Sequence, residues 1–346
     1  MYSKELADLG LVVFRHQNST GGMKPHVFIR FSSGGKPITF AVDTTRLSSK
    51  KTQPDAYLIT HAHSDHYGKS AMLSENAWCS EETARALEIR YEKDYLGNTF
   101  KIGEAIDICG VSVQTFDVFH APGSSAFYWE NDLGTRILVT GDVKDFSALP
   151  ACDVLFTEAS YGDPSDLSCS FKDDVAGLHE AVLSHIGTRP IAFGAYEFGK
   201  SQKAVGLLRE MGYTGPIVMN SKTLTLTQSF VQNAGELVTM EQIQIEQSCT
   251  NISIVPIQDL FGLDMTVQKY VLTCRSDSPF QNIRLSDHLD VNGLTQMVQA
   301  LNPKLTVVYH PNKSPRTDRF AKHLEKNGYK AFSINQIQNI LSEKKI

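Results

Sequence analysis

The spacing of apolar positions along the chain changes near residue 170. Before that point, short apolar runs alternate with polar positions. The runs 26–31 and 38–43 flank Ser-Ser-Gly-Gly-Lys-Pro, a pattern typical of a β-hairpin. Unbroken apolar runs at 136–140 and 154–157 predict strands that are buried on both faces. We therefore expect many strands with short connections in the first part of the chain.

The middle of the chain alternates predicted helices with predicted strands. Helical periodicity over 173–186 and 200–211 is followed in each case by a short apolar run, at 191–194 and 216–219. This alternation predicts a parallel sheet.

A strand at 283–288 is predicted to bring the chain back to the first domain. A helix at 291–301 and a strand at 305–309 follow, and a last helix begins near Pro315. The middle block is therefore predicted to be inserted. We expect a first domain of residues 1–170 and 283–346, and an inserted domain of residues 171–282.

The composition is that of a globular protein. The chain has 346 residues, of which 41% are hydrophobic and 21% charged, so disorder is not expected. Six scattered cysteines form no C-x-x-C pair, which argues against a disulfide framework and fits a reducing compartment. The N-terminus does not resemble a signal peptide, and no apolar run has the length of a membrane span. We therefore predict a cytoplasmic protein without membrane contact.

The net charge of −5 excludes a globally basic nucleic-acid binder. Residues 311 to 346, however, include eight Lys and Arg residues and only three Asp and Glu residues. A local basic surface of this kind could steer a polyanion. A solvated helix face with a lysine-rich tail explains the same charges equally well.

The densest candidate chemistry is the segment His61-Ala-His63-Ser-Asp65-His66, directly after an apolar run. In an extended chain His61 and His63 point to the same side, and the other two side chains follow as the chain turns. Neutral imidazole and carboxylate suit zinc, and an open coordination position generates a hydroxide near neutral pH. This segment predicts a metal site.

Further candidate ligands stand at the ends of predicted strands. They are His120, Asp142, Glu158 and His288. Each alone could be an ordinary loop residue. Together with the histidine-rich segment they complete two shells, one of three histidines and one of Asp65, His66 and His288, with Asp142 as the bridge. Paired metals about 3.5–4 Å apart clamp the attacking and leaving oxygens of an in-line displacement.

In this order the residues resemble the motifs of the metallo-β-lactamase superfamily, and the later ones its β-CASP branch of nucleases. Glu158-Ala-Ser-Tyr-Gly162 resembles motif A, Ser286-Asp-His288 motif B and Tyr309-His310 motif C, and 198–202 resembles a segment of the inserted domain. The resemblance covers about residues 38–312. It implies an α/β fold, a four-layer αββα sandwich with an inserted small α/β β-CASP domain.

The resemblance also implies two Zn²⁺ ions, although Mn²⁺ accepts the same ligands. It assigns the first ion to His61, His63 and His120. It assigns the second ion to Asp65, His66 and His288.

The resemblance assigns the remaining site residues to supporting and catalytic positions. Asp142 bridges the ions, Asp43 holds a ligand imidazole, and Glu158 hydrogen-bonds a catalytic histidine. His310 faces the scissile phosphate. Motif C usually continues as His-Gly-Glu, whereas Pro and Asn follow His310 here.

A second phosphate contact is predicted at Lys200 and Ser201. They open a predicted helix, whose free N–H groups attract anions. An ordinary helix start with an exposed lysine explains the same residues.

These features together predict a two-zinc phosphodiesterase that cuts or trims RNA or another single-stranded nucleic acid, as an exonuclease or an endonuclease. RNA is favoured over DNA on His310 alone, because DNA-repair members of the branch generally carry Val at motif C. The alternatives are a DNA exonuclease used in repair and a small-molecule hydrolase such as a thioesterase. The oligomeric state is left open, with a homodimer as one option.

Overall fold

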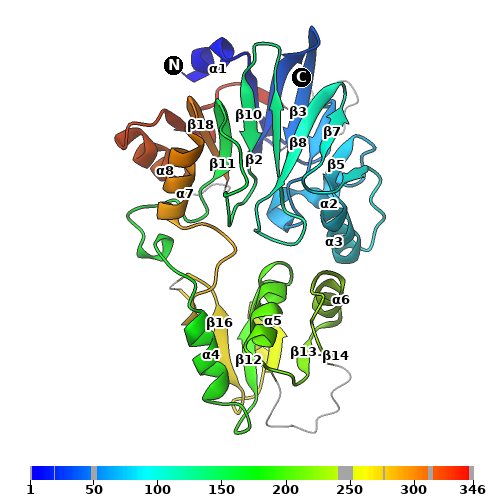
Figure 1. The fold of residues 1–346 in the computed structure, drawn as a ribbon, viewed down its shortest axis with the longest axis vertical. Helices are drawn as coiled ribbons and strands as arrows, with labels where there is room; N and C mark the ends of the chain where they lie inside the picture. Colours follow the sequence, from blue (N-terminus) through cyan, green and yellow to red (C-terminus); the bar gives the residue numbers. More distant parts are fainter. Residues whose placement is uncertain are drawn as a thin grey trace. The chain divides into compact units, whose positions relative to one another are not determined.

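The computed structural model describes residues 2–18, 20–47, 53–240, 252–275, 277–310 and 315–342. The chain divides into two compact units, Met1–Ser170 with His288–Ile346, and Phe171–Asp287. Figure 1 shows the elements of both units. No helix in the described ranges has both the length and the apolar character needed to span a bilayer.

The first unit contains two seven-stranded sheets. One has the order β20 (Ile340–Ser342), β1 (Val12–Gln17), β2 (Met23–Ser33), β3 (Lys36–Val42), β4 (Ala56–Leu58), β5 (Ala77–Ser80) and β6 (Asn98–Phe100). The other has the order β19 (Ala331–Ser333), β18 (Leu305–His310), β11 (Val154–Glu158), β10 (Arg136–Val139), β9 (Ser125–Glu130), β8 (Val111–Asp117) and β7 (Ala105–Ile108).

The two sheets pack face to face around one apolar core. Phe40 of the first sheet contacts Trp129 of the second, with 5.3 Å between ring centroids, and both side chains are almost completely buried. Strands that bury one face alternate apolar and polar positions, as β8 does.

Helices cover the outer faces of this sandwich (Figure 1). α2 (Gly68–Ala71) and α3 (Glu81–Tyr91) lie beside the first sheet, and α7 (Val291–Leu301) and α8 (Pro315–Lys326) lie beside the second. The short α1 (Tyr2–Asp8) precedes β1. The predicted αββα sandwich is confirmed.

The second unit is built on a six-stranded sheet in which every pair is parallel. Its order is β14 (Leu237–Thr239), β13 (Ile217–Met219), β15 (Ile252–Val255), β12 (Ile191–Gly194), β16 (Gln268–Leu272) and β17 (Gln281–Ile283). Its helices are α4 (Val175–Leu183), α5 (Lys200–Glu210) and α6 (Ser221–Phe230). Short 3-10 helices occur in both units: η2 (Ser64–His66), η3 (Leu167–Cys169), η4 (Ile257–Gly262) and η5 (Ile334–Gln336).

The return to the first unit differs from the sequence prediction. No strand covers 283–288, because β17 ends at Ile283 and pairs with β16 in the second unit. Ile283 and Leu285 also pack in the core of that unit. The first unit therefore resumes at His288 rather than at residue 283.

Candidate metal centre

The candidate site lies where five strands of the first unit end. In the first sheet, β3 and β4 run parallel, and Asp43 and the segment from His61 to His66 follow them. In the second sheet, β10, β11 and β18 run parallel and end next to Asp142 or at Glu158 and His310. The polar side chains at the carboxyl ends of these strands, from both sheets, therefore lie close together.

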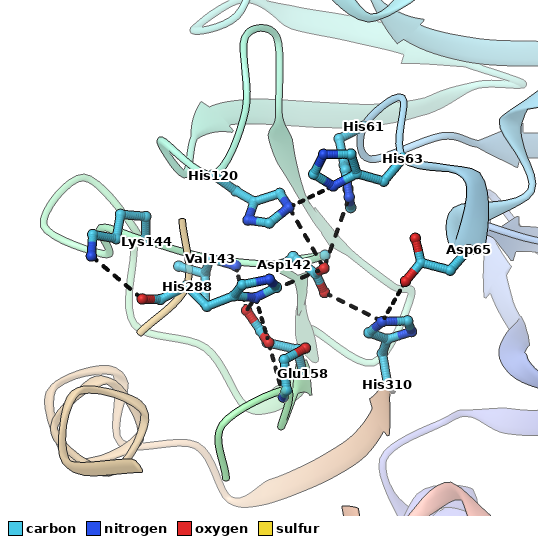
Figure 2. A network of polar contacts seen from close by, with 12 residues as sticks. His61, His63, Asp65, His120, Asp142, Val143, Lys144, Glu158, His288 and His310 are labelled. Carbon is cyan, nitrogen blue, oxygen red and sulfur yellow. Dashed lines mark hydrogen bonds and ion pairs between the residues drawn. The ribbon is translucent and has the colours of Figure 1, made fainter. Parts of the chain in front are cut away.

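Four overlapping groups in this place could each hold a metal ion. They are His61 with His63 and His120; His61 with His66 and Asp142; Asp65 with His66 and His310; and His120 with Asp142 and His288. The ligand atoms within each group lie within 4.8 Å of one another. The clustered imidazoles and carboxylates seen in Figure 2 form a metal-binding site.

The first group is the three-histidine set expected from the sequence. His120 Nε2 lies 2.9 Å from His63 Nδ1, and the His61 and His120 rings are 4.6 Å apart. His61 Nε2 and Asp142 Oδ1 are buried and make no hydrogen bond within the described part of the chain. Buried polar atoms without a partner are costly, and a bound cation would satisfy both of them.

Asp142 lies between the groups. Its Oδ2 is 3.3 Å from His66 Nε2 and 3.7 Å from His120 Nε2, whereas its Oδ1 is 4.0 Å from His310 Nε2. This buried carboxylate therefore lies between imidazoles of both expected ligand sets; its role as a bridge stays a prediction.

His288 and His310 occupy places different from those predicted from the sequence. His310 Nε2 lies 3.5 Å from Asp65 Oδ2, and its ring is 4.4 Å from that of His66. His288 Nδ1 instead lies 2.9 and 3.0 Å from the two oxygens of Glu158. The sequence prediction had grouped His288 with Asp65 and His66, and had placed His310 at the phosphate.

The topology explains this exchange. β18 is paired with β11 inside the sheet, so His310 at its end is 3% exposed and lies among the ligands. His288 comes from the segment before α7, and its side chain is 20% exposed. Glu158 is fully buried and also accepts hydrogen bonds from the backbone N–H groups of Val143 and Ser160 (2.8 and 3.0 Å).

Asp43 orients two of the candidate ligands. Its carboxylate accepts from the N–H and hydroxyl of Thr60 and lies next to His66 Nδ1, each at 2.8 Å. Because the Thr60 hydroxyl donates to Asp43, it can accept from His61 Nδ1, which is 3.0 Å away. Both imidazoles then carry their proton on Nδ1 and present Nε2 to a metal.

The charges of the cluster shift the pKa values of its members. Burial alone would raise the pKa of Asp142, but the imidazoles of His66 and His310 hold it well below the ordinary value. Burial and the neighbouring histidines lower the pKa of His61. Asp142 is thus ionised and His61 favours its neutral form, as a divalent cation needs. Burial would lower the pKa of His66, but the carboxylates of Asp142 and Asp43 raise it well above its ordinary value, so an ion held by this imidazole would displace a proton.

The chain adopts backbone conformations here that few residues tolerate. Gly141 has a φ of 62°, and a Cβ at this position would lie 2.6 Å from Thr60 Oγ1. Only glycine therefore lets the chain pass Thr60 before it reaches Asp142.

Lys200 and Ser201 belong to the second unit. The Ser201 hydroxyl donates to the carbonyl of Tyr196 (2.6 Å), and the N–H of Gly199 donates to Gln202 Oε1 (2.7 Å). Two groups of the predicted anion site are therefore engaged within the fold. Lys200 is 3% exposed, and burial lowers its pKa. A phosphate contact at Lys200 stays a prediction.

The basic C-terminal stretch is partly neutralised. Arg316 pairs with Asp166 at 2.8 Å, and Arg319 pairs with Asp163. Lys313 lies outside the described residues. These ion pairs reduce the positive charge that this face could offer to a polyanion.

Thr60 and Tyr161 are site residues that the sequence prediction did not include. Tyr161 packs edge-on against His288, with 5.7 Å between ring centroids, and Arg316 lies over its ring. Thr60 could have been predicted from its position directly before the histidine-rich segment. Tyr161 could have been predicted from its place within Glu-Ala-Ser-Tyr-Gly.

Comparisons with known proteins find that the chain is similar to parts of longer proteins, several of which are named for DNA ligation or DNA repair. It is 23% identical over 310 residues to a probable DNA ligase of Opitutus terrae, covering 80% of this chain and 28% of that protein. It is 30% identical over 195 residues to the DNA cross-link repair protein pso2/snm1 of Schizosaccharomyces pombe, covering 50% of this chain and 34% of that protein. The 5' exonuclease Apollo of Gallus gallus is also 30% identical, over 172 residues, covering 45% of this chain and 36% of that protein.

The chain thus spans about a third of the length of these relatives. No family model matches it. A crystal structure of a protein of unknown function from Enterococcus faecalis V583 shares the fold, with a TM-score of 0.61, 13% identity, and coverage of 94% of this chain and 97% of that one.

Proposed function

Because the chain belongs to the β-CASP branch of the metallo-β-lactamase superfamily, we propose that it is a metal-dependent nuclease that hydrolyses phosphodiester bonds in DNA. The polar edge of the sandwich is its active site. The similar proteins are named for DNA ligation, DNA cross-link repair and 5' exonuclease activity.

DNA replaces RNA as the favoured substrate for two reasons. The names of these relatives that mention a nucleic acid mention DNA. The RNA prediction rested on His310 alone. His310 lies near Asp65 and His66 in a group that could hold a metal ion, and a metal ligand is needed for either nucleic acid. RNA cleavage becomes the second candidate.

We assign the ligands from the groups that the fold brings together. His61, His63 and His120 hold one ion, and Asp65, His66 and His310 hold the other, with Asp142 between them. The nitrogen and oxygen donors suit zinc, and manganese accepts the same set. Divalent cations bound there would polarise the phosphate and lower the pKa of water to near neutrality.

We assign His288 the role of the general acid that protonates the leaving group. Glu158 accepts a hydrogen bond from Nδ1–H of His288 and stabilises the charged imidazolium. The proton on Nε2 is then available to the oxygen that leaves the phosphorus. Burial of Glu158 and its two backbone donors hold this pair in place.

The Glu158–His288 pair beside Asp142 is the observation that carries the proposal. The deprotonated sugar oxygen that leaves a phosphodiester is strongly basic, so an acid in this position accelerates its departure. A thiolate is a weak base and leaves a thioester without an acid, so a thioesterase would have little use for this pair.

One set of substrates separates the three candidates. DNA and RNA oligonucleotides of the same sequence, labelled separately at each end, are incubated with the metal-loaded protein, and S-lactoylglutathione is tested in parallel. We expect faster cleavage of DNA, with mononucleotides released from the 5' end. Cleavage of RNA alone would favour the second candidate, and turnover of the thioester alone would refute a nuclease.

A further inference from the structure

Phe119 combines three properties that a bulky residue seldom has together. Its side chain is 59% exposed, its φ of 54° lies in the left-handed region, and it directly precedes the candidate ligand His120. An aromatic residue with positive φ is strained, and such strain gathers at functional sites.

Other residues with positive φ fall into two classes. Glu92 and Asn302 end helices, and Cys109 stands in the tight turn between β7 and β8, so their conformations follow from local structure. Asp43 instead borders the metal centre through its hydrogen bonds, and Tyr67, although it ends the 3-10 helix η2, directly follows the candidate ligand His66. Phe119 belongs to this second class by position.

The turn that carries Phe119 is held on both sides. The N–H of Phe119 donates to Asp117 Oδ1 (2.7 Å), and the N–H groups of Lys144 and Asp145 donate to the carbonyl of Val118 (2.8 and 3.1 Å). The N–H of His120 donates to Ser124 Oγ (3.0 Å). The fold therefore enforces the exposed position of the ring, although asparagine or glycine would suit the backbone better.

We propose that Phe119 is a stacking platform for a nucleobase next to the scissile phosphate. This inference rests on the proposed nuclease function. Consecutive Cα atoms are about 3.8 Å apart, so the exposed ring is carried by the residue next to a candidate metal ligand, a suitable position for contact with the nucleotide being cut. Every base has a flat π-face, so stacking holds single strands without selecting a sequence.

Phe119→Asn is the decisive variant because it removes the ring and suits a left-handed backbone. We expect its melting temperature to equal or exceed that of the wild type and its metal content to be unchanged. Its affinity for single-stranded DNA should fall about 5- to 100-fold, the range that alanine substitution of a stacking residue gives. Leu133→Asn is the matched control. It removes an exposed apolar side chain from the β9–β10 turn and should leave the affinity unchanged.

A substrate with one abasic position identifies the stacked base. When the substrate lacks the stacked base, the wild type and Phe119→Asn should bind and cleave it equally. With intact DNA, the wild type should bind more tightly than the variant. If the wild type cleaves DNA and Phe119→Asn binds intact DNA as tightly as the wild type, the stacking inference is wrong.

Fluorescence separates this inference from the proposed function. In Phe119→Trp, with metal removed by chelator, oligothymidylate should quench the added indole emission, with the wild type as the background. Quenching without any DNA cleavage by the wild type would support the platform and refute the nuclease. Absence of quenching would refute the platform whatever the activity.

Discussion

Asp43→Asn should weaken metal binding without changing the shape of the site. The carboxylate accepts from the Thr60 N–H through one oxygen, and from the Thr60 hydroxyl and His66 Nδ1 through the other. An amide has only one oxygen. Whichever way the amide turns, its NH₂ group therefore faces a donor. If it faces His66, that imidazole must move its proton to Nε2, the atom that the metal needs.

The magnitude follows from the hydrogen bond that the amide cannot accept. One buried donor left without an acceptor costs about 1–3 kcal/mol, which corresponds to about 5- to 100-fold in affinity. Loss of an outer partner of a metal ligand typically costs about 10- to 100-fold. We therefore expect metal affinity to fall about 10- to 100-fold, with backbone strain unchanged because asparagine tolerates the φ of 49° at this position.

Competition with a chromophoric chelator measures this affinity, and metal analysis after dialysis gives the stoichiometry. Asp132→Asn is the control. The carboxylate of Asp132 also accepts three hydrogen bonds, and their donors lie in or next to the β2–β3 turn, at the opposite end of β3 from Asp43. Unchanged metal affinity in Asp43→Asn would refute the argument that Asp43 sets the protonation of His66. An equal loss in Asp132→Asn would assign the effect to general destabilisation.

Two further predictions concern the catalytic pair and the stability of the sheet. His310→Gln should lower the metal content, whereas His288→Gln should keep both ions and lose about 100-fold or more in turnover; the opposite pattern would restore the assignment made from the sequence. Asp153→Asn should destabilise the protein by about 2–4 kcal/mol, because the nearly buried carboxylate accepts three hydrogen bonds from Arg136. Those bonds hold the pKa of Asp153 below its ordinary 3.8, so its contribution is complete above about pH 4 and is lost as the pH falls further. Urea unfolding of both proteins at pH 7 and pH 3 checks this, and an equal difference at the two pH values would contradict it.

Local sequence was enough to identify four of the candidate ligands. His61, His63, Asp65 and His66 stand within six positions after a buried strand, so chain geometry alone brings them together. The apolar runs likewise revealed the strands whose ends carry Asp142 and Glu158.

Sequence could not assign His288 and His310, because each reaches the site from a distant segment. Which one meets Asp65 depends on the pairing of β18 with β11, and this pairing is a property of the whole sheet. The strand predicted at 283–288 failed for a similar reason, since β17 joins the sheet of the second unit. The conformation of Phe119 left no signal, because composition and periodicity carry no information on a single positive φ.

The most direct test of the account is single-turnover cleavage of 5'-labelled single-stranded DNA by the metal-loaded wild type and Asp142→Asn, with DNA affinity measured on both. If Asp142 holds the two metal groups together, the variant should bind DNA within about threefold of the wild type and lose nearly all cleavage. Cleavage at the wild-type rate by Asp142→Asn, or by wild type freed of metal, would contradict a metal-dependent nuclease centred on this carboxylate.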